Sequence, residues 1–312
     1  MSIETENLTF RGSDAISTIN ARLWVDNSSD HKAVVQLVHG MAEHIDRYDE
    51  FARHLASCGY VVCGHDHIGH GGSVDDPSQL GHMPMKGGKD ILLGDIHTLR
   101  CAISQRYPNL PYFVFGHSMG SFATRCYLSR HGEGLSGAVL CGTGNQAAAL
   151  SKAGNALCHV IGVFKGSDFR SKLVDSMAAG GFNNSIADPR TELDWLSYNE
   201  ENVDAYNADE RCGFMFSVGA YAALTSMSAE AVTSGCVAGY PKDLPLLYIA
   251  GEEDPVGECG KGVRAAAELA RKAGVEDVQV KLYPHMRHEI LNEDDRRVVM
   301  TDVEAWLAEH LR

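Results

Sequence analysis

The sequence lacks the features that mark membrane-spanning and secreted proteins. No stretch reaches the roughly 18 apolar residues that a membrane-spanning helix needs. Residues 1–30 are polar and mixed, without the charged segment and the following apolar segment of a signal peptide. We therefore expect a cytoplasmic protein that does not insert stably into a membrane.

Clusters of basic residues and paired cysteines are also missing. The formal net charge of −14 at pH 7 disfavours nucleic acid or an anionic membrane as the main partner. The nine cysteines are scattered from Cys58 to Cys259, and no two of them form a Cys-x-x-Cys pair. This pattern predicts reduced thiols rather than a disulfide framework or a zinc ribbon.

The chain does have the material for a large core, because 44% of its 312 residues are hydrophobic. Short apolar runs alternate with segments of helical periodicity, an order that builds a mostly parallel sheet with helices on both faces. The expected strands are Leu23–Asp26, Ala33–Val38, Tyr60–Gly64, Pro111–Phe115, Gly137–Cys141, Leu244–Ala250 and Val278–Tyr283. The expected helices of this core are Tyr48–Ser57, Ile91–Tyr107, Ser121–Arg130, Val263–Lys272 and Val298–Leu311.

The alternation stops between about Gly142 and Pro241. Helical patterns at Ala156–Phe164 and Phe214–Met227 occur there without a strand between them. We therefore predict an α/β core made of residues 1–141 and 242–312. Residues 142–241 are predicted to form a helical cap, inserted after the strand that ends near Cys141.

The most informative motif is the Gly-x-Ser-x-Gly turn at Gly116–Gly120, which follows an apolar run directly. A serine that presents its hydroxyl at the end of a strand needs a sharp turn. Small residues two positions to either side let the strand and the next helix approach closely. The motif therefore predicts Ser118 as a nucleophile.

A nucleophilic serine needs a histidine to take its proton and a buried carboxylate to hold the histidine ring. In open parallel sheets these groups lie at the carboxyl ends of later strands, in the chain order serine, acid, histidine. Asp254 and His288 follow two such strands and are the preferred candidates. Spacing alone does not choose between Asp254 and its neighbours Glu252 and Glu253, or between His288 and His285.

Ester hydrolysis also needs hydrogen-bond donors for the negatively charged oxygen of the intermediate. The backbone N–H of the residue after the nucleophile is one such donor, which points to Met119. The second comes from the loop after an earlier strand. Met41 fits that position, because it follows a strand that runs into His39 and Gly40.

Several groups of residues in this chain are landmarks of one family. They are His39–His44 with Arg47 and Tyr48, Asp66–Gly71, Gly116–Gly120 and Arg287–Glu289. Through them the chain resembles α/β-hydrolases of the monoglyceride lipase and lysophospholipase branch, which is related to serine aminopeptidase-like hydrolases. The resemblance covers nearly the whole chain and includes Asn207–Asp209 and Cys212–Phe214 of the predicted cap. The chain departs from the family at Glu210–Arg211, where Pro-Leu is common, and at Ser121, where a second glycine is common.

The resemblance implies hydrolysis of a carboxylic ester, of the monoacylglycerol or lysophospholipid type, through an acyl-enzyme. Ser118 would attack the ester, with Asp254 as the acid and His288 as the base. The amides of Met41 and Met119 would hold the oxyanion. No cofactor is required, and the partner is a small acyl ester or lipid. The cap would roof the site and allow transient contact with a lipid surface.

Other functions fit parts of the sequence. His65–His70 contains His-x-His-x-x-His just after a strand, and histidine is a common zinc ligand, so a metal hydrolase is one alternative. Against it, no matching later set of Asp and His ligands is evident, and a glycine-rich turn explains the same residues. A non-catalytic pocket protein is a second alternative. A short-chain carboxylesterase, thioesterase, peptidase or acyltransferase with the same fold is a third.

One apolar stripe in the predicted cap has two interpretations. It comprises Ala156, Leu157, Val160, Ile161, Val163 and Phe164. The stripe is either a wall of the acyl-binding site or the face that docks the cap on the core, since amphipathic helices usually bury their apolar side.

Overall fold

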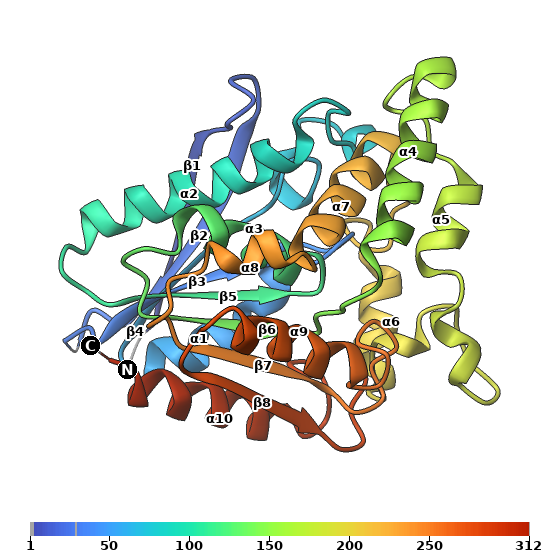
Figure 1. The fold of residues 1–312 in the computed structure, drawn as a ribbon. Coiled ribbons are helices and arrows are strands. Elements are labelled where there is room, and N and C mark those ends of the chain that lie inside the picture. Colours follow the sequence, from blue (N-terminus) through green and yellow to red (C-terminus); the bar gives the residue numbers. More distant parts are fainter. Residues whose placement is uncertain (1–2, 29, 312) are drawn as a thin grey trace.

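The computed structural model describes residues 3–28 and 30–311 (Figure 1). Its centre is one eight-stranded sheet with the strand order β1-β2-β4-β3-β5-β6-β7-β8. The strands are β1 (Glu4–Arg11), β2 (Thr18–Val25), β3 (Ala33–Val38), β4 (Tyr60–His65), β5 (Tyr112–His117), β6 (Gly137–Cys141), β7 (Leu246–Gly251) and β8 (Val278–Tyr283). All neighbouring pairs are parallel except β1 with β2 and β2 with β4. The predicted α/β-hydrolase fold is confirmed.

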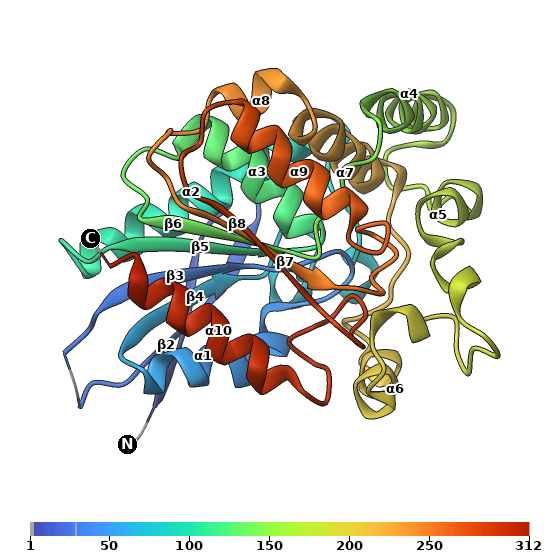
Figure 2. The same ribbon diagram turned by 60° about the horizontal axis from the view of Figure 1, so that its bottom comes forward.

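Helices cover both faces of the sheet (Figure 2). They are α1 (Asp49–Ser57) and α10 (Arg296–Glu309) on one face, and α2 (Gly88–Arg106), α3 (Met119–His131), α8 (Ser234–Ala238) and α9 (Lys261–Lys272) on the other. Strands β3 to β7 are buried along their whole length, which explains why their sequences are continuous apolar runs rather than alternating ones. This burial holds the ends of β3, β5 and β7 in fixed positions.

The first strand was not predicted from the sequence. β1 has no buried residue and pairs with β2 at the edge of the sheet, where a polar strand is stable because its backbone is hydrogen-bonded on one side only. The second strand begins at Thr18, five residues before the predicted start at Leu23. Both differences arise because edge strands are specified by pairing rather than by apolar side chains.

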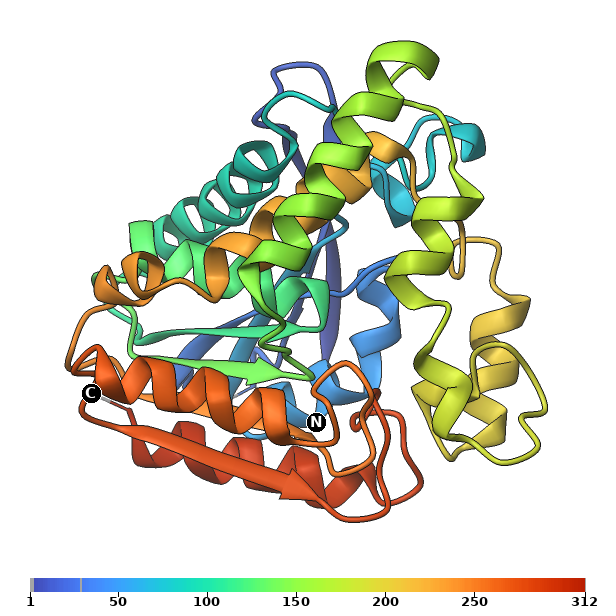
Figure 3. The same cartoon turned by 45° about the vertical axis from the view of Figure 1, so that its right-hand side comes forward.

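Five helices lie between β6 and β7. They are α4 (Ala148–Lys165), α5 (Lys172–Ala179), α6 (Glu200–Ala208), α7 (Val218–Ala231) and α8, of which α5, α6 and α8 were not predicted. Figures 1 and 3 show α4, α5 and α6 beyond the carboxyl ends of the parallel strands. Helix α7 differs, because Tyr221 and Met227 share a hydrophobic cluster with α2 and α3. The cap boundaries at residues 142 and 241 stay a prediction, and by packing α7 is continuous with the core.

The apolar stripe of α4 divides between two environments. Leu157 and Ile161 pack against the core cluster, whereas Val160, Val163 and Phe164 are exposed. One side of the helix therefore docks it on the molecule, and the other side faces solvent.

Candidate active site

Ser118 occupies a sharp turn between β5 and α3. Its backbone has φ 53° and ψ −119°, a conformation that non-glycine residues adopt only where the surrounding structure enforces it. The N–H of Ser118 donates to the carbonyl oxygen of Cys141 at 3.0 Å, which fixes the turn against β6. The strand-turn-helix context predicted for the Gly-x-Ser-x-Gly motif is present.

The two glycines of the motif are required by close packing. A Cβ atom at Gly116 would lie 2.3 Å from Oγ1 of Thr124, and one at Gly120 would lie 2.1 Å from the carbonyl oxygen of Val38. No side chain fits at such distances, so only glycine lets α3 cross the strands this closely.

Ser121 has a local role. It is fully buried, and its hydroxyl donates to the carbonyl oxygen of Ser118 at 2.6 Å. The serine that stands in place of a glycine thus braces the first turn of α3.

Asp254 and His288 contact each other at the ends of β7 and β8. Nδ1 of His288 lies 2.9 Å from Oδ1 of Asp254, and the two residues are 2% and 0% exposed. The N–H of Val256 also donates to Oδ1 of Asp254, at 2.9 Å. In contrast, Glu253 is exposed and the side chain of His285 is 92% exposed. Of the alternatives that spacing left open, the geometry pairs Asp254 with His288.

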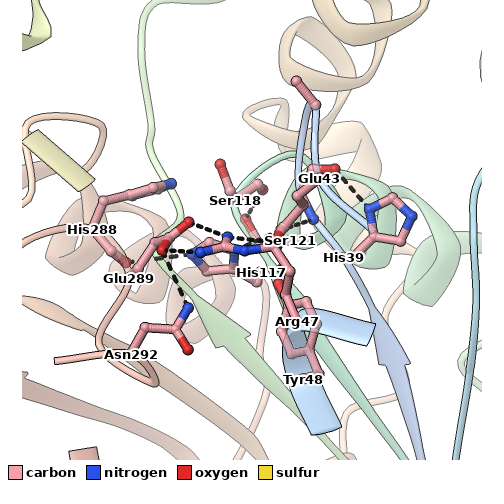
Figure 4. A network of polar contacts seen from close by, with 12 residues as sticks. His39, Glu43, Arg47, Tyr48, His117, Ser118, Ser121, His288, Glu289 and Asn292 are labelled. Carbon is pink, nitrogen blue, oxygen red and sulfur yellow. Dashed lines mark hydrogen bonds and ion pairs between the residues drawn. The ribbon is translucent and has the colours of Figure 1, made fainter. Parts of the chain in front are cut away.

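The ring of His288 points toward Ser118 in Figure 4. It also packs on the ring of Trp195, with 5.1 Å between centroids, and against Gly142, where a Cβ would lie 3.0 Å from Cε1 of His288. Within the described residues, the hydroxyl of Ser118 and His288 are not joined by a hydrogen bond. Catalytic hydrogen bonds of free enzymes often tighten only when substrate binds.

The loop after β3 passes directly against the serine. A Cβ at Gly40 would lie 3.1 Å from Cβ of Ser118. The N–H of Gly40 donates to Oε1 of Glu43 at 2.5 Å, and its carbonyl oxygen accepts from Nδ1 of His39 at 2.8 Å. The peptide groups beside Met41 are therefore held in a fixed orientation.

Two backbone donors next to the serine are free. In the chain as described, from residue 3 to 28 and 30 to 311, neither the N–H of Met41 nor that of Met119 donates a hydrogen bond. Met119 is the first residue of α3, so its N–H has no partner within the helix and lies at the positive end of the helix dipole. Both groups are available to an oxygen atom bound beside Ser118.

Four buried histidines support this loop. Nε2 of His39 accepts from the N–H of His67, and Nε2 of His67 donates to the carbonyl oxygen of His39, both at 3.0 Å. Nδ1 of His67 lies 3.3 Å from Nε2 of His65, and Nε2 of His70 accepts from the N–H of Ala42 at 3.4 Å. Burial lowers the pKa of all four, to about 3 for His65 and about 4 for His70, so the rings are neutral. These hydrogen bonds account for the histidine-rich segment without a metal ion.

Two other groups bring three possible ligand atoms within 4.8 Å of one another. They are His44, Asp209 and Cys212, and Cys126, Glu230 and Cys236. The carboxylate of Asp209 already lies 3.2 Å from Arg211, and that of Glu230 lies 2.6 Å from Lys89. Because cations of the protein already neutralise both carboxylates, we assign no metal to either group.

A cluster of four charged side chains, Glu43, Arg47, His117 and Glu289, is buried beside the serine (Figure 4). Oε1 of Glu43 lies 3.2 Å from Nδ1 of His117, and its Oε2 lies 3.1 Å from Arg47. Arg47 forms two hydrogen bonds with Glu289, at 2.5 and 2.7 Å. Nε2 of His117 lies 3.3 Å from the carbonyl oxygen of His288. We refer to these four residues as the buried ion cluster.

All members of the buried ion cluster are charged. Burial disfavours the charged ring of His117, but the hydrogen bond and charge of Glu43 raise its pKa. Burial likewise disfavours the two carboxylates, yet His117 lowers the pKa of Glu43 and Arg47 lowers that of Glu289. Two negative and two positive charges therefore balance in the interior.

Sequence reasoning used part of this site without assigning it. Glu43, Arg47 and Glu289 were quoted as family landmarks, and His117 was part of the serine motif, but none received a role. The signal that could have found them is a set of charged residues directly beside the glycine, serine and histidine motifs. Trp195, which covers the ring of His288, carried no signal in the sequence.

Comparisons with known proteins agree with this arrangement. Residues 29–295 match the family described as serine aminopeptidase, S33. A monoacylglycerol lipase from Mycolicibacterium smegmatis is 29% identical over 93% of this chain and 92% of its own, and the mouse monoglyceride lipase is 26% identical over 93% and 86%. The crystal structure of a thermostable carboxyl esterase from Bacillus coagulans in complex with glycerol superposes with a TM-score of 0.92, at 31% identity, over the full length of both chains.

Proposed function

Because this chain belongs to the serine aminopeptidase S33 family of α/β-hydrolases, we propose that Ser118, His288 and Asp254 are its nucleophile, base and acid. The chain is a serine carboxylic ester hydrolase of the monoglyceride lipase type. The observation that carries the assignment is the buried contact between Asp254 and His288, whose ring points toward the strained serine.

The chemistry follows from the positions of the atoms. Oγ of Ser118 attacks the ester carbonyl carbon while Nε2 of His288 takes the hydroxyl proton. Asp254 accepts the Nδ1–H bond, so it holds the correct tautomer and stabilises the imidazolium. The N–H groups of Met41 and Met119 bind the oxyanion of the tetrahedral intermediate.

The second half of the reaction reverses the proton transfer. His288 returns the proton to the departing alcohol oxygen, which leaves an acyl group on Ser118. A water molecule then gives its proton to His288 and attacks the acyl carbon, and a second tetrahedral intermediate collapses to the free acid and the serine.

We further propose that the substrate is a monoacylglycerol or a lysophospholipid. The Mycolicibacterium and mouse relatives carry the names monoacylglycerol lipase and monoglyceride lipase, and the Bacillus esterase was crystallised with glycerol. These names support an ester of glycerol with a single acyl chain.

We propose that α4 and α5 contact the surface of lipid aggregates. The outer side of α4 carries Val163 and Phe164, which are 82% and 80% exposed, and α5 adds Leu173 at 61%. Lys152 and Lys165 are exposed on α4, which has no acidic residue. Apolar side chains flanked by lysines fit an anionic lipid surface, despite the negative charge of the whole chain.

Any such contact is peripheral. Within residues 3–28 and 30–311, none of the helices combines the length and the apolar character needed to cross a membrane. The exposed side chains of α4 and α5 would reach only the interfacial layer.

Labelling by a fluorophosphonate, followed by intact-mass measurement, tests the catalytic assignment. We expect one adduct on the wild-type protein and none on Ser118→Ala. Ser121→Ala is the matched control, because Ser121 lies on the same turn but donates its hydroxyl to a carbonyl, and it should still be labelled. Hydrolysis of monoacylglycerol by Ser118→Ala at the wild-type rate would refute the assignment.

A further inference from the structure

The buried ion cluster is linked to the loop that contains the proposed oxyanion donor. Oε1 of Glu43 accepts from the N–H of Gly40 at 2.5 Å and from the hydroxyl of Tyr48 at 2.8 Å. Gly40 directly precedes Met41. A carboxylate fixed by three donors therefore determines how the peptides on either side of Gly40 are oriented.

The same cluster is linked to the backbone of the proposed base. Nδ1 of His117 faces a carboxylate and its Nε2 faces the carbonyl oxygen of His288, and neither acceptor carries a proton to donate. Both ring nitrogens of His117 must then donate, so the ring is an imidazolium on geometric grounds alone. The rings of His117 and His288 lie 4.8 Å apart.

A third link leads to the helices beyond the carboxyl ends of the strands. Nδ2 of Asn202, on α6, donates to Oε2 of Glu289 at 2.7 Å, and Oδ1 of Asn202 accepts from Arg47 at 2.9 Å. The N–H of Glu289 donates to the carbonyl oxygen of Leu196 at 2.7 Å. The residue after His288 is thus held from both sides.

We propose that Glu43, Arg47, His117 and Glu289 are positioning residues, which hold the Gly40–Met41 peptide and the backbone of His288 in the arrangement that hydrolysis requires. This inference rests on the proposed function, because it assigns the cluster to the same active site. The cluster touches neither the substrate nor the reacting atoms. Four buried charges that served stability alone would have no reason to end on these two backbone groups, and well-packed apolar residues are often at least as stable.

The experiment compares His117→Gln with a matched control. His310→Gln is suitable, because His310 is also buried and bridges a backbone carbonyl, of Trp306, and a carboxylate, of Asp277. It lies near the amino end of β8, whereas Ser118 lies at the carboxyl end of β5. Tyr48→Phe is the milder second variant, since it removes one hydrogen bond to Glu43 and keeps every charge.

Three quantities are measured: kcat and KM for p-nitrophenyl butyrate, the rate of backbone amide hydrogen exchange, and the melting temperature. We expect His117→Gln to lower kcat by about a hundredfold, the order of loss that a displacement of about 1 Å causes, with KM changed less than about threefold. Exchange should accelerate in residues 39–42 and 285–290. Tyr48→Phe should show a smaller fall in kcat, and His310→Gln should lower the melting temperature without lowering kcat.

Two results would overturn the proposal. One is a folded His117→Gln protein with wild-type kcat, and the other is unchanged exchange in both segments. If His117→Gln does not fold, a Tyr48→Phe protein with wild-type kcat and exchange has the same meaning. Failure of the proposed function is recognised separately, because the wild-type protein would then take no fluorophosphonate label, whereas the exchange comparison needs no activity.

Discussion

Asp254 accepts a hydrogen bond from His288 inside the protein, although its neighbour Glu253 points outward and accepts one from the hydroxyl of Tyr198. The turn after β7 therefore separates two adjacent carboxylates into different environments. One is fully buried and the other is exposed. This separation leads to the most direct test of the catalytic assignment.

We predict that Asp254→Asn lowers kcat for p-nitrophenyl butyrate by about 10⁴-fold, because an amide favours the wrong tautomer of the histidine ring. Glu253→Gln should retain kcat within a fewfold of the wild type. Both variants should fold, which circular dichroism would verify. The reverse ranking of the two variants would mean that the acid has been misidentified.

A second prediction concerns the glycines of the serine turn. Gly120→Ala should lower the free energy of unfolding by about 1–3 kcal/mol or more, because the added methyl group overlaps the carbonyl of Val38. Gly235→Ala, in helix α8, is the control. A Cβ there has no neighbour within 4 Å, and alanine should stabilise the helix by up to about 1 kcal/mol. Urea unfolding measures both, and equal effects would contradict the packing argument.

Much of this arrangement is readable from the sequence, for identifiable reasons. The strand before Ser118 is predictable because a strand buried on both faces must be apolar throughout. The choice between Glu253 and Asp254 is not, because one residue more or less in a turn reverses the direction of a side chain. Strand β1 escapes detection because its polar residues are held by backbone pairing.

The buried ion cluster shows a different limit. Arg47 and Glu289 are 242 positions apart in the chain, and their contact exists only because β3 and β8 end on the same side of the sheet. No local periodicity encodes a pair at that separation. Motif residues such as Glu43 can be recognised from sequence, but their partners cannot.

The third prediction is a loss of stability in acid. The four histidines behind the Gly40 loop have lowered pKa values in the folded state, including about 3 for His65 and about 4 for His70. In the unfolded chain each titrates near pH 6.5. Below that pH the unfolded state binds more protons, so the free energy of unfolding falls as pH decreases, by up to about 1.4 kcal/mol per pH unit for each histidine.

The measurement is the melting temperature from pH 7.5 to pH 5. It should fall steadily below about pH 6.5, and a variant that removes one titrating ring, His65→Gln, should show a shallower fall. His65 suits this purpose because its Nδ1 has no partner within the described residues. His117 acts in the opposite direction, because its raised pKa makes its contribution decline as pH rises through that value. A melting temperature independent of pH in the acid range would contradict neutral buried rings.

The last prediction concerns the lipid-facing side of α4. We expect Val163→Ser combined with Phe164→Ser to reduce co-sedimentation with anionic vesicles at least about tenfold, because each buried apolar side chain contributes roughly 1.5–3 kcal/mol. In Figure 3, α4 and α5 project at the outer edge of the molecule, away from the sheet. Hydrolysis of soluble p-nitrophenyl acetate should change little, because the exposed side of α4 faces solvent rather than the core.

Two controls make the vesicle test specific. Ile16→Ser removes an equally exposed apolar residue, 80% exposed, from the turn between β1 and β2, and should leave vesicle binding unchanged. Replacing anionic with zwitterionic vesicles should weaken binding of the wild-type protein, because Lys152 and Lys165 would lose their attraction to the surface. Binding that is equal for the α4 variant and the Ile16 variant would show that general hydrophobicity, rather than this helix, holds the protein at the lipid.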